Sequence, residues 1–315
     1  MEYLILLVSL IGIVYSADYL VAGSVSIARR YRVSDFVIGA AIVGVGTSMP
    51  ELVVSFIGAL QGNSDVAIGN IVGSNIFNIL GILGLTAMLF PITVTKENRR
   101  FELPVCIGVS VLLTVMVFNP LNSGGFTISR ADGILLLVLF GLYMWYSFYR
   151  ERRHRKDAEI DIREDKTPLW KAILAVVGGL AVLIVSCDIF VDNAVRIARS
   201  FGVSDAFISL TLIACGTSLP ELATSIAAAL KKNTQLALGN IVGSNIFNIT
   251  WILGISAQVM PLNTSDITRV DYIVMIAAAI APLVLGFKGK IGRLSGLFML
   301  SCFVAYTLYL YLYSI

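Results

Sequence analysis

An eleven-residue segment, GNIVGSNIFNI, occurs twice in this chain, at residues 69–79 and again at 239–249. The match continues upstream in the same register, because GTSMPEL at 46–52 corresponds to GTSLPEL at 216–222. Both pairs are offset by 170 positions, so no insertion separates the two motifs in either copy. Two such copies indicate two similar halves, and the polar residues that recur in both predict where the halves meet.

Composition predicts that these halves lie in a membrane. Apolar residues make up 57% of the chain and charged residues 14%, whereas an average soluble domain has roughly 25% charged residues. So few charges cannot cover a water-exposed surface of this size. A nucleic-acid-binding function is also excluded, because the net charge is only +3 and no soluble domain with a basic face is present.

Ten apolar segments are predicted to cross the hydrocarbon core, which is roughly 30 Å thick, as helices. They lie near residues 3–27, 36–60, 66–90, 103–118, 133–148, 170–197, 207–230, 236–260, 272–287 and 294–313. The chain is therefore predicted to be an all-α membrane protein with ten transmembrane helices. The even number places both termini on the same side of the membrane.

The basic residues predict which side that is, because Lys and Arg are retained in the cytoplasm during insertion. With both termini outside, the outer segments keep only Arg130, Arg196, Arg199 and Arg269. We therefore expect a multi-pass protein of the cell membrane with both termini outside. The polar stretch that starts at residue 150 becomes a cytoplasmic linker, 150–169, between a first five-helix repeat, 1–149, and a second, 170–315. Five is an odd number, so the second repeat is predicted to be inverted, an arrangement typical of transporters.

The repeated motif predicts a broken helix in each half. In GVGTSMPEL, Gly44 and Gly46 loosen the helix, and Pro50 removes a backbone donor and disfavours helical geometry at the residue before it. The second copy repeats this pattern around Pro220. A break within hydrocarbon is tolerated only against protein or a wet, ion-lined cavity. The two breaks therefore mark the expected functional site.

A glutamate follows each proline, Glu51 in the first half and Glu221 in the second. One carboxylate in the middle of a membrane costs on the order of 3 kcal/mol, and two that face each other also repel. We therefore expect a cation between them. Other oxygen-bearing side chains recur at helical spacing: Thr47, Ser55, Asn70, Ser74 and Asn78, matched by Thr217, Ser225, Asn240, Ser244 and Asn248. Such a set suits Ca²⁺ or Na⁺ rather than a thiophilic metal.

Several of these positions have a second interpretation. GxxxG spacing with Ser or Asn on the same face is common wherever transmembrane helices pack closely. Ion binding is favoured for Glu51 and Glu221, because an acid recurs beside the predicted break in both halves. Asp18 and Asp188, within the first and sixth spans, are interpreted as partners of a neighbouring helix, with an ion entrance as the alternative. Asp35, like Asp205, is interpreted as a helix cap.

Two other classes of function fit less well. An intramembrane aspartyl hydrolase would need facing aspartates, whereas the mirrored pair is Glu, and the sequence has no HExxH or GxSxG motif. We therefore predict that the chain is not an enzyme and needs no cofactor. A cation channel usually builds its acidic ring from several identical subunits, whereas the symmetry here is internal and inverted.

The GTSMPEL and GTSLPEL segments, each followed by GNIVGSNIFN, resemble the two alpha-repeats of the sodium/calcium exchanger family, and the resemblance covers the whole chain. It implies an antiporter that works by alternating access, with the first and sixth spans sliding as gates. It also implies that Glu51 and Glu221 are the principal Ca²⁺ ligands, together with carbonyl oxygens of Thr47 and Thr217. Flanking Na⁺ sites are implied for Ser48, Ser74, Ser218, Ser244 and the carbonyl of Ala214.

One position departs from the family pattern. Many of these exchangers place an Asp in one of the two GSNxxN segments, whereas this chain has Asn78 and Asn248. The expected site then carries two formal negative charges, which one Ca²⁺, two Na⁺ or two H⁺ neutralise, and a neutral site crosses the low-dielectric barrier more easily. We predict exchange of Ca²⁺ for Na⁺, with Ca²⁺/H⁺ exchange as the alternative. The expected partners are these ions and the lipid bilayer, with the chain acting as a monomer.

Overall fold

The computed structural model describes residues 2–118, 127–154, 167–201, 214–264 and 267–313. The first part of the chain forms α1 (Glu2–Tyr31), α2 (Asp35–Ile38), α3 (Val45–Thr47), α4 (Met49–Leu60), α5 (Ser64–Ile76), α6 (Gly84–Leu89), α7 (Leu103–Val117) and α8 (Arg130–His154). The second part forms α9 (Leu169–Ser200), α11 (Ala214–Gly216), α12 (Leu219–Leu230), α13 (Thr234–Phe247), α14 (Leu253–Val259), α15 (Arg269–Leu285) and α16 (Arg293–Tyr313).

Short π-helical segments join several of these helices into longer ones. They are η1 (Gly39–Gly44), η2 (Phe77–Leu83), η3 (Asn98–Glu102) and η5 (Asn248–Ile252). Thus α5, η2 and α6 form one continuous apolar helix, Ser64–Leu89, and α13, η5 and α14 form another, Thr234–Val259. The second of these is almost entirely enclosed by the rest of the protein. These two helices contain the repeated GNIVGSNIFNI segments.

The described residues contain seven helices that are long and apolar enough to cross a membrane, and an eighth if the bent pair Asp35–Thr47 and Met49–Leu60 counts as one span. They correspond to eight of the ten predicted segments. The ninth segment overlaps α15, which has 17 residues. The seventh segment contains α12, which has 12 residues, and the beginning of the seventh segment lies outside the described residues. The protein is therefore a mostly helical membrane protein, and the full number of ten spans remains a prediction.

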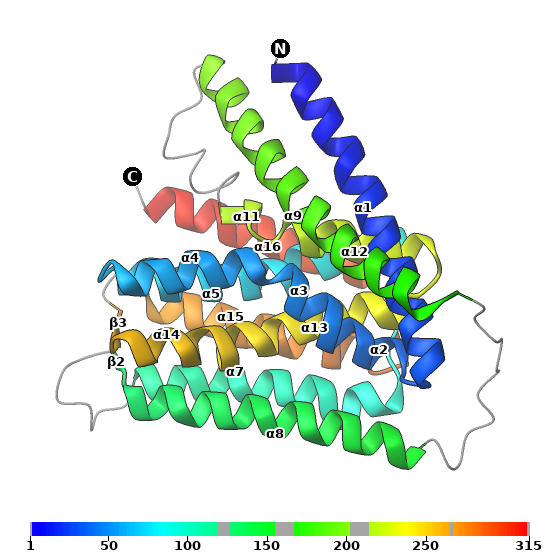
Figure 1. The fold of residues 1–315 in the computed structure, drawn as a ribbon. Helices are drawn as coiled ribbons and strands as arrows, with labels where there is room; N and C mark the ends of the chain where they lie inside the picture. Colours follow the sequence, from blue (N-terminus) through cyan, green and yellow to red (C-terminus); the bar gives the residue numbers. More distant parts are fainter. Residues whose placement is uncertain (1, 119–126, 155–166, 202–213, 265–266, 314–315) are drawn as a thin grey trace.

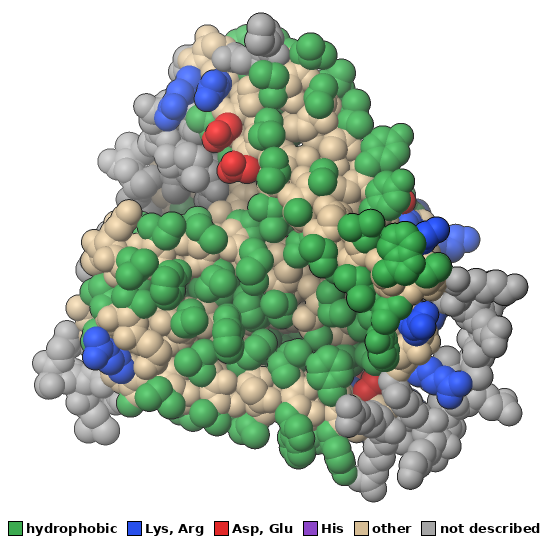
Figure 2. All heavy atoms as spheres, in the orientation of Figure 1, with side chains coloured by type: hydrophobic (Ala, Val, Ile, Leu, Met, Phe, Trp, Pro, Cys, Tyr) green, Lys and Arg blue, Asp and Glu red, His purple; other side chains and the backbone are tan. Residues whose placement is uncertain are grey.

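Helices α1 and α9 lie side by side and are inclined to the remaining helices (Figure 1). Small residues let them approach closely, since a Cβ on Gly179 would come within 3.0 Å of the Leu20 backbone nitrogen. The same two helices were predicted to act as gates. Their outward faces carry large apolar side chains such as Tyr15, Leu174 and Val177, each more than half exposed. Figure 2 shows such apolar side chains across the visible face of the molecule, as expected for a surface in contact with lipid.

Two short strand pairs close the opposite ends of the helical bundle. Strand β1 (Ile92–Thr93) pairs antiparallel with β4 (Lys290–Ile291), and β2 (Thr127–Ile128) pairs antiparallel with β3 (Leu262–Asn263). The Thr93 amide donates to Thr234 Oγ1 at the start of α13, whereas β3 follows the end of α14. The β1–β4 pair and the β2–β3 pair therefore lie at the two ends of the Thr234–Val259 helix.

One predicted cap is corrected by the structure. Helix α2 is capped by Ser34, whose hydroxyl oxygen accepts a hydrogen bond from the Val37 amide, and Asp35 is the first helical residue rather than the cap. Aspartate is a common helix cap. Here, however, Ser34, one position earlier, has the extended backbone that a cap requires. Asp205, the matching prediction in the second half, lies outside the described residues.

Candidate ion-binding site

The two predicted helix breaks are present. In the first half the helix axis bends by 48° between α3 and α4, at Ser48. Ser48 has φ −82° and ψ 13°, and Ser218, at the same place in the second half, has φ −93° and ψ 10°. Both values lie outside the helical range, and the proline that follows occupies the first turn of α4 or α12. The breaks bring a serine hydroxyl and a carboxylate into the interior of the protein.

The two glutamates are fully buried and are held by serines of the opposite half. Ser218 Oγ donates a hydrogen bond to Glu51 Oε1 at 2.8 Å, and Ser48 Oγ donates to Glu221 Oε1 at 2.8 Å. Both carboxylates have 0% relative exposure. Because each bond links the break of one half to the acid of the other, the two motifs form one site rather than two.

A second hydroxyl reaches each carboxylate from its own half. Ser74 Oγ donates to Glu51 Oε1 at 3.5 Å, and Ser244 Oγ donates to Glu221 Oε1 at 3.3 Å. The Ser244 hydroxyl also lies 3.1 Å from the Gly44 carbonyl oxygen. All four serines were predicted from the sequence, and the structure brings all four to the glutamates.

Five buried side-chain oxygens near the breaks or in the repeated segments have no hydrogen-bond partner in the part of the chain that the structure describes. They are Glu51 Oε2, Glu221 Oε2, Asn78 Oδ1, Asn248 Oδ1 and Thr217 Oγ1. An unpaired polar atom in a low-dielectric interior is costly, and a buried charge much more so. The first four come in pairs from equivalent positions of the two halves. Acceptor oxygens without a donor are the atoms that a bound cation would satisfy.

The asparagines of the two GSNIFN segments join the halves directly. The Asn78 amide donates to Asn245 Oδ1 at 3.0 Å, and the Asn248 amide donates to Asn75 Oδ1, also at 3.0 Å. The amides of Asn75 and Asn245 in turn donate to each other's backbone carbonyls. These bonds use the Asn78 and Asn248 amide groups and leave their carbonyl oxygens unpaired. Asn75 and Asn245 were not predicted, although their recurrence in both copies was a signal that could have identified them.

The two threonines differ in their surroundings. Thr47 is fully buried and donates to Asn240 Oδ1 at 3.2 Å, and the Asn240 amide donates to the Glu221 backbone carbonyl. Thr217 is half-buried and its hydroxyl is unpaired. The equivalent amide, that of Asn70, donates in the same way to the Glu51 carbonyl, and also to Ser55 Oγ. The two halves are thus alike at the carboxylates and unlike at the threonines.

Thr217 lines a cavity of about 630 Å³ between α4, α9 and the second break. Asp188 and Asp192 of α9 line the same cavity, as does Pro220. The cavity therefore connects acidic side chains of a predicted gate helix to the region of the glutamates. Ala214, the remaining predicted ligand, is the first residue of α11, and its side chain lies outside what the structure describes.

The comparisons with known proteins agree with this geometry. The model of the family described as sodium/calcium exchanger protein matches residues 1–149 and 171–312. The chain belongs to the sodium/calcium exchanger family. This exchanger is therefore an antiporter of the membrane rather than an enzyme, and the ions of its family are transported substrates rather than cofactors.

Its relatives cover nearly the whole chain. The exchanger is 40% identical to the putative antiporter CaxA of Alkalimonas amylolytica, over 95% of each chain. It is 32% identical to the sodium/calcium exchanger MaX1 of Methanosarcina acetivorans, over 98% of each. Among solved structures, it resembles the sodium-calcium exchanger NCX_Mj soaked with Na⁺ and Sr²⁺, with a TM-score of 0.82, 32% identity and 96% of each chain covered.

Proposed function

We propose that this protein exchanges Ca²⁺ for Na⁺ across the cell membrane by alternating access. The observation that carries the proposal is the reciprocal pair of hydrogen bonds from Ser48 to Glu221 and from Ser218 to Glu51. These bonds hold one oxygen of each carboxylate and leave the other free and buried. A hard divalent cation prefers such carboxylate, amide and hydroxyl oxygens. The family membership and the likeness to the sodium/calcium exchanger MaX1 support the same pair of ions.

The ion ligands in this proposal are those expected from the sequence. Glu51 and Glu221 bind Ca²⁺ together with the carbonyl oxygens of Thr47 and Thr217. The flanking Na⁺ sites are formed by Ser48, Ser74, Ser218 and Ser244, with the Asn78 and Asn248 oxygens and the Ala214 carbonyl nearby. The four unpaired oxygens of the glutamates and asparagines support this arrangement, because their burial without donors is costly until a cation binds.

We further propose that the fold consists of ten spans in two inverted repeats, 1–149 and 170–315, joined by the linker 150–169. Strands β1 and β3 support the inversion, because Ile92 and Leu262 are 170 positions apart and the two strands lie at opposite ends of the Thr234–Val259 helix. Exchange of conformation between two such halves converts an outward-open transporter into an inward-open one.

The distribution of basic residues supports a cytoplasmic location for the β1–β4 end and outside termini. Lys231 and Lys232 precede Asn233 at the start of α13, next to β1, and Lys288 and Lys290 lie at β4. The opposite end has Arg130, whose side chain donates to the Val259 carbonyl. Lys and Arg accumulate on the cytoplasmic side of membrane proteins. We expect the protein to act as a monomer.

Neutralisation of the two carboxylates provides the coupling. One Ca²⁺ or two Na⁺ cancel the formal charge of Glu51 and Glu221, and only a neutral site moves easily through the low-dielectric interior. Because the occupied site alternates between the two cations, their movements in opposite directions are linked. Two protons would neutralise the same pair, so Ca²⁺/H⁺ exchange is the second candidate, favoured by the absence of a third carboxylate at Asn78 and Asn248.

Vesicle transport separates these candidates. Purified protein in sealed vesicles should take up radiolabelled Ca²⁺ when Na⁺ is loaded inside and diluted outside. A pH gradient without Na⁺ should drive little uptake. Uptake that follows the pH gradient alone would replace Na⁺ by H⁺ as the driving ion, and Ca²⁺ movement that needs no counter-ion on the opposite face would indicate a channel.

A further inference from the structure

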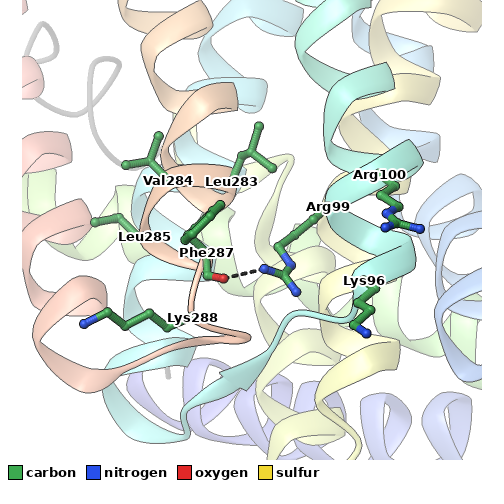
Figure 3. A pocket seen from close by; sticks show the side chains of 8 residues that line it. All are labelled: Lys96, Arg99, Arg100, Leu283, Val284, Leu285, Phe287 and Lys288. Carbon is green, nitrogen blue, oxygen red and sulfur yellow. Dashed lines mark hydrogen bonds between the residues drawn. The ribbon is translucent and has the colours of Figure 1, made fainter.

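A cavity of about 960 Å³ lies at the β1–β4 end of the protein, away from the glutamates. It is formed by the segment that follows β1 and by the last turn of α15 with the residues after it. Its lining residues are Lys96, Arg99, Arg100, Leu283, Val284, Leu285, Phe287 and Lys288 (Figure 3). No activity proposed above uses it.

On the basic side of this cavity, Arg99 is held in place by Phe287. Arg99 Nη1 donates a hydrogen bond to the Phe287 carbonyl, and the guanidinium lies 5.8 Å from the centroid of the Phe287 ring. Figure 3 shows Arg99 between the neighbouring Lys96 and Arg100 and the apolar side chains of α15. Lys96 and Arg100 are exposed. Arg99 is thereby fixed in place while its two neighbours remain available to a ligand.

Among the residues that the structure describes, the lining contains four basic residues and no acidic residue. Glu97 lies on the same turn but does not line the cavity. The nearby Glu102 is buried and engaged, since it accepts hydrogen bonds from Arg150 Nη2 and from the Tyr143 hydroxyl, each at 3.1 Å. The cavity therefore presents uncompensated positive charge to an anion.

The other side of the cavity is apolar and faces outward. Val284 is 63% exposed and Phe287 is 71% exposed, and both stand at the end of a predicted transmembrane segment. An inorganic anion would gain nothing from these side chains. A molecule with a phosphate and a hydrocarbon chain would use both sides at once, because burial of each methylene contributes about 0.8 kcal/mol.

We propose that this cavity binds one anionic phospholipid, with its headgroup phosphate among Lys96, Arg99 and Arg100 and its acyl chain on Leu283, Val284 and Phe287. Basic pockets between transmembrane helices at the cytoplasmic face are the sites where such headgroups bind. The lipid contacts the segment before α7 and the end of α15, so it links a helix of the first repeat to a helix of the second. The orientation proposed above places it in the cytoplasmic leaflet.

Lipid retention tests the proposal without any transport measurement, so its failure is distinguishable from failure of the exchange function. The full-length protein is purified from mixed micelles of phosphatidylglycerol and phosphatidylcholine, and bound lipid is counted by native mass spectrometry. We expect the wild type to retain phosphatidylglycerol preferentially. The double variant Lys96→Gln, Arg100→Gln should lower this preference about thirtyfold, the scale expected when two basic side chains leave an anionic surface.

The matched control is Arg29→Gln, Arg30→Gln. It removes the same charge from exposed residues at the end of α1, which do not line the cavity. The control should keep the wild-type preference. An unchanged preference in the Lys96, Arg100 variant would overturn the proposal, and so would an equal loss in the control, which would indicate diffuse attraction by net charge.

Two further measurements separate a lipid from a free phosphate ion. Val284→Asn leaves every charge in place and should lower retention of phosphatidylglycerol, because the acyl chain loses part of its apolar contact. An excess of inorganic phosphate should displace none of the bound lipid. Full retention by the Val284 variant, or displacement of the lipid by phosphate, would show that the cavity holds an anion and not a phospholipid.

Discussion

The crossed hydrogen bonds at the carboxylates decide how each glutamate can serve a cation. Ser218 and Ser48 each occupy one oxygen of the opposite glutamate at 2.8 Å, and the second oxygen of each acid is free. The bond fixes the carboxylate without neutralising it. A hydrogen bond to a charged group contributes about 1.5–3 kcal/mol, so each serine is expected to matter to ion affinity.

Ser48→Ala and Ser218→Ala should each raise the KM for Ca²⁺ uptake by about tenfold or more, since a charged acceptor loses its donor. The measurement is initial uptake into vesicles over a range of Ca²⁺ concentrations. Ser110→Ala is the control, because that hydroxyl is buried but donates only to the Cys106 carbonyl of its own helix. A KM that does not change in either test variant would separate the serines from the ion site.

Asn248→Asp should make the Na⁺ dependence of Ca²⁺ release steeper. Its carbonyl oxygen is buried and unpaired, so a carboxylate there adds a third negative charge that requires a further cation for neutrality. The Hill coefficient for Na⁺ measures the change, and Asn78→Asp tests the equivalent position. If both variants keep the wild-type Na⁺ dependence, these asparagines lie outside the ion cavity.

For individual residues, recurrence in both copies of the motif was enough to single out the glutamates and serines that meet in the structure. Their role as ion ligands stays a prediction. The sequence could not predict that Thr47 is paired with Asn240 while Thr217 is unpaired. The residues around the two threonines are nearly identical, so the difference arises from how the two halves are placed. Tertiary contacts, not local pattern, determine such asymmetry.

Helix packing gives the two copies of the repeated segment different roles. Gly73 and Gly243 are equivalent residues in identical sequences. A Cβ on Gly243 would collide with the Ala40 backbone, whereas a Cβ on Gly73 would come within 4 Å of none of the described residues. Helix α13 therefore packs directly against η1, whereas Gly73 of α5 lines a cavity of about 240 Å³.

Gly243→Ala should lower the free energy of unfolding by about 1–3 kcal/mol, because the backbone of η1 must move aside. Gly73→Ala should leave it unchanged or raise it by up to about 1 kcal/mol, the gain in helix propensity. Thermal unfolding midpoints in detergent compare the two variants. Equal midpoints would contradict the close contact of α13 with η1.

An ion pair ties the predicted gate helix α1 to the end of α12. Lys231 Nζ lies 2.7 Å from Asp18 Oδ1 and donates to the Asp18 carbonyl at 2.9 Å. This confirms the interpretation of Asp18 as a partner of a neighbouring element. The equivalent of Lys231 in the first half is Gln61, which carries no charge for Asp188. The Lys231–Asp18 ion pair therefore cannot form between the equivalent residues of the other half. It favours the arrangement in which α1 contacts α12.

Lys231→Gln should loosen α1. The accessibility of this part of α1 is measured with Ala17→Cys in a background without native cysteines, because Ala17 is 1% exposed and precedes Asp18. Maleimide labelling of this cysteine should accelerate about two- to fivefold, the scale of a partly exposed ion pair. The control Lys232→Gln removes the adjacent charge. Identical labelling rates for the two variants would mean that the pair does not restrain the helix.

Helix breaks were predictable because proline acts locally. The π-helical segments η1, η2 and η5 were not, because their sequences contain no proline and read as ordinary apolar helix. Segments η2 and η5 begin at or next to Asn78 and Asn248, whose hydrogen bonds to the other half form only in the folded protein.

Over the whole molecule, composition and the internal repeat predict a helical membrane transporter, and the family membership agrees; the division into two inverted repeats stays a prediction. The number of spans was harder to confirm from the helices, since α12 and α15 are short. The basic cavity that we propose as a phospholipid site was not predicted from the sequence. Its two sides come from residues 96–100 and 283–288, which the pairing of β1 with β4 and the packing of α7 on α15 bring together.

Direct Ca²⁺ binding tests the central claim, that Glu51 and Glu221 hold one ion between them. Isothermal titration of the purified protein should give one Ca²⁺ per chain. Glu51→Gln and Glu221→Gln should each abolish binding, while Glu151→Gln, a half-buried carboxylate that accepts hydrogen bonds from Ser34 away from the site, should bind as the wild type does. If either single variant still binds Ca²⁺ with wild-type affinity, the two acids do not share a cation and the account is wrong.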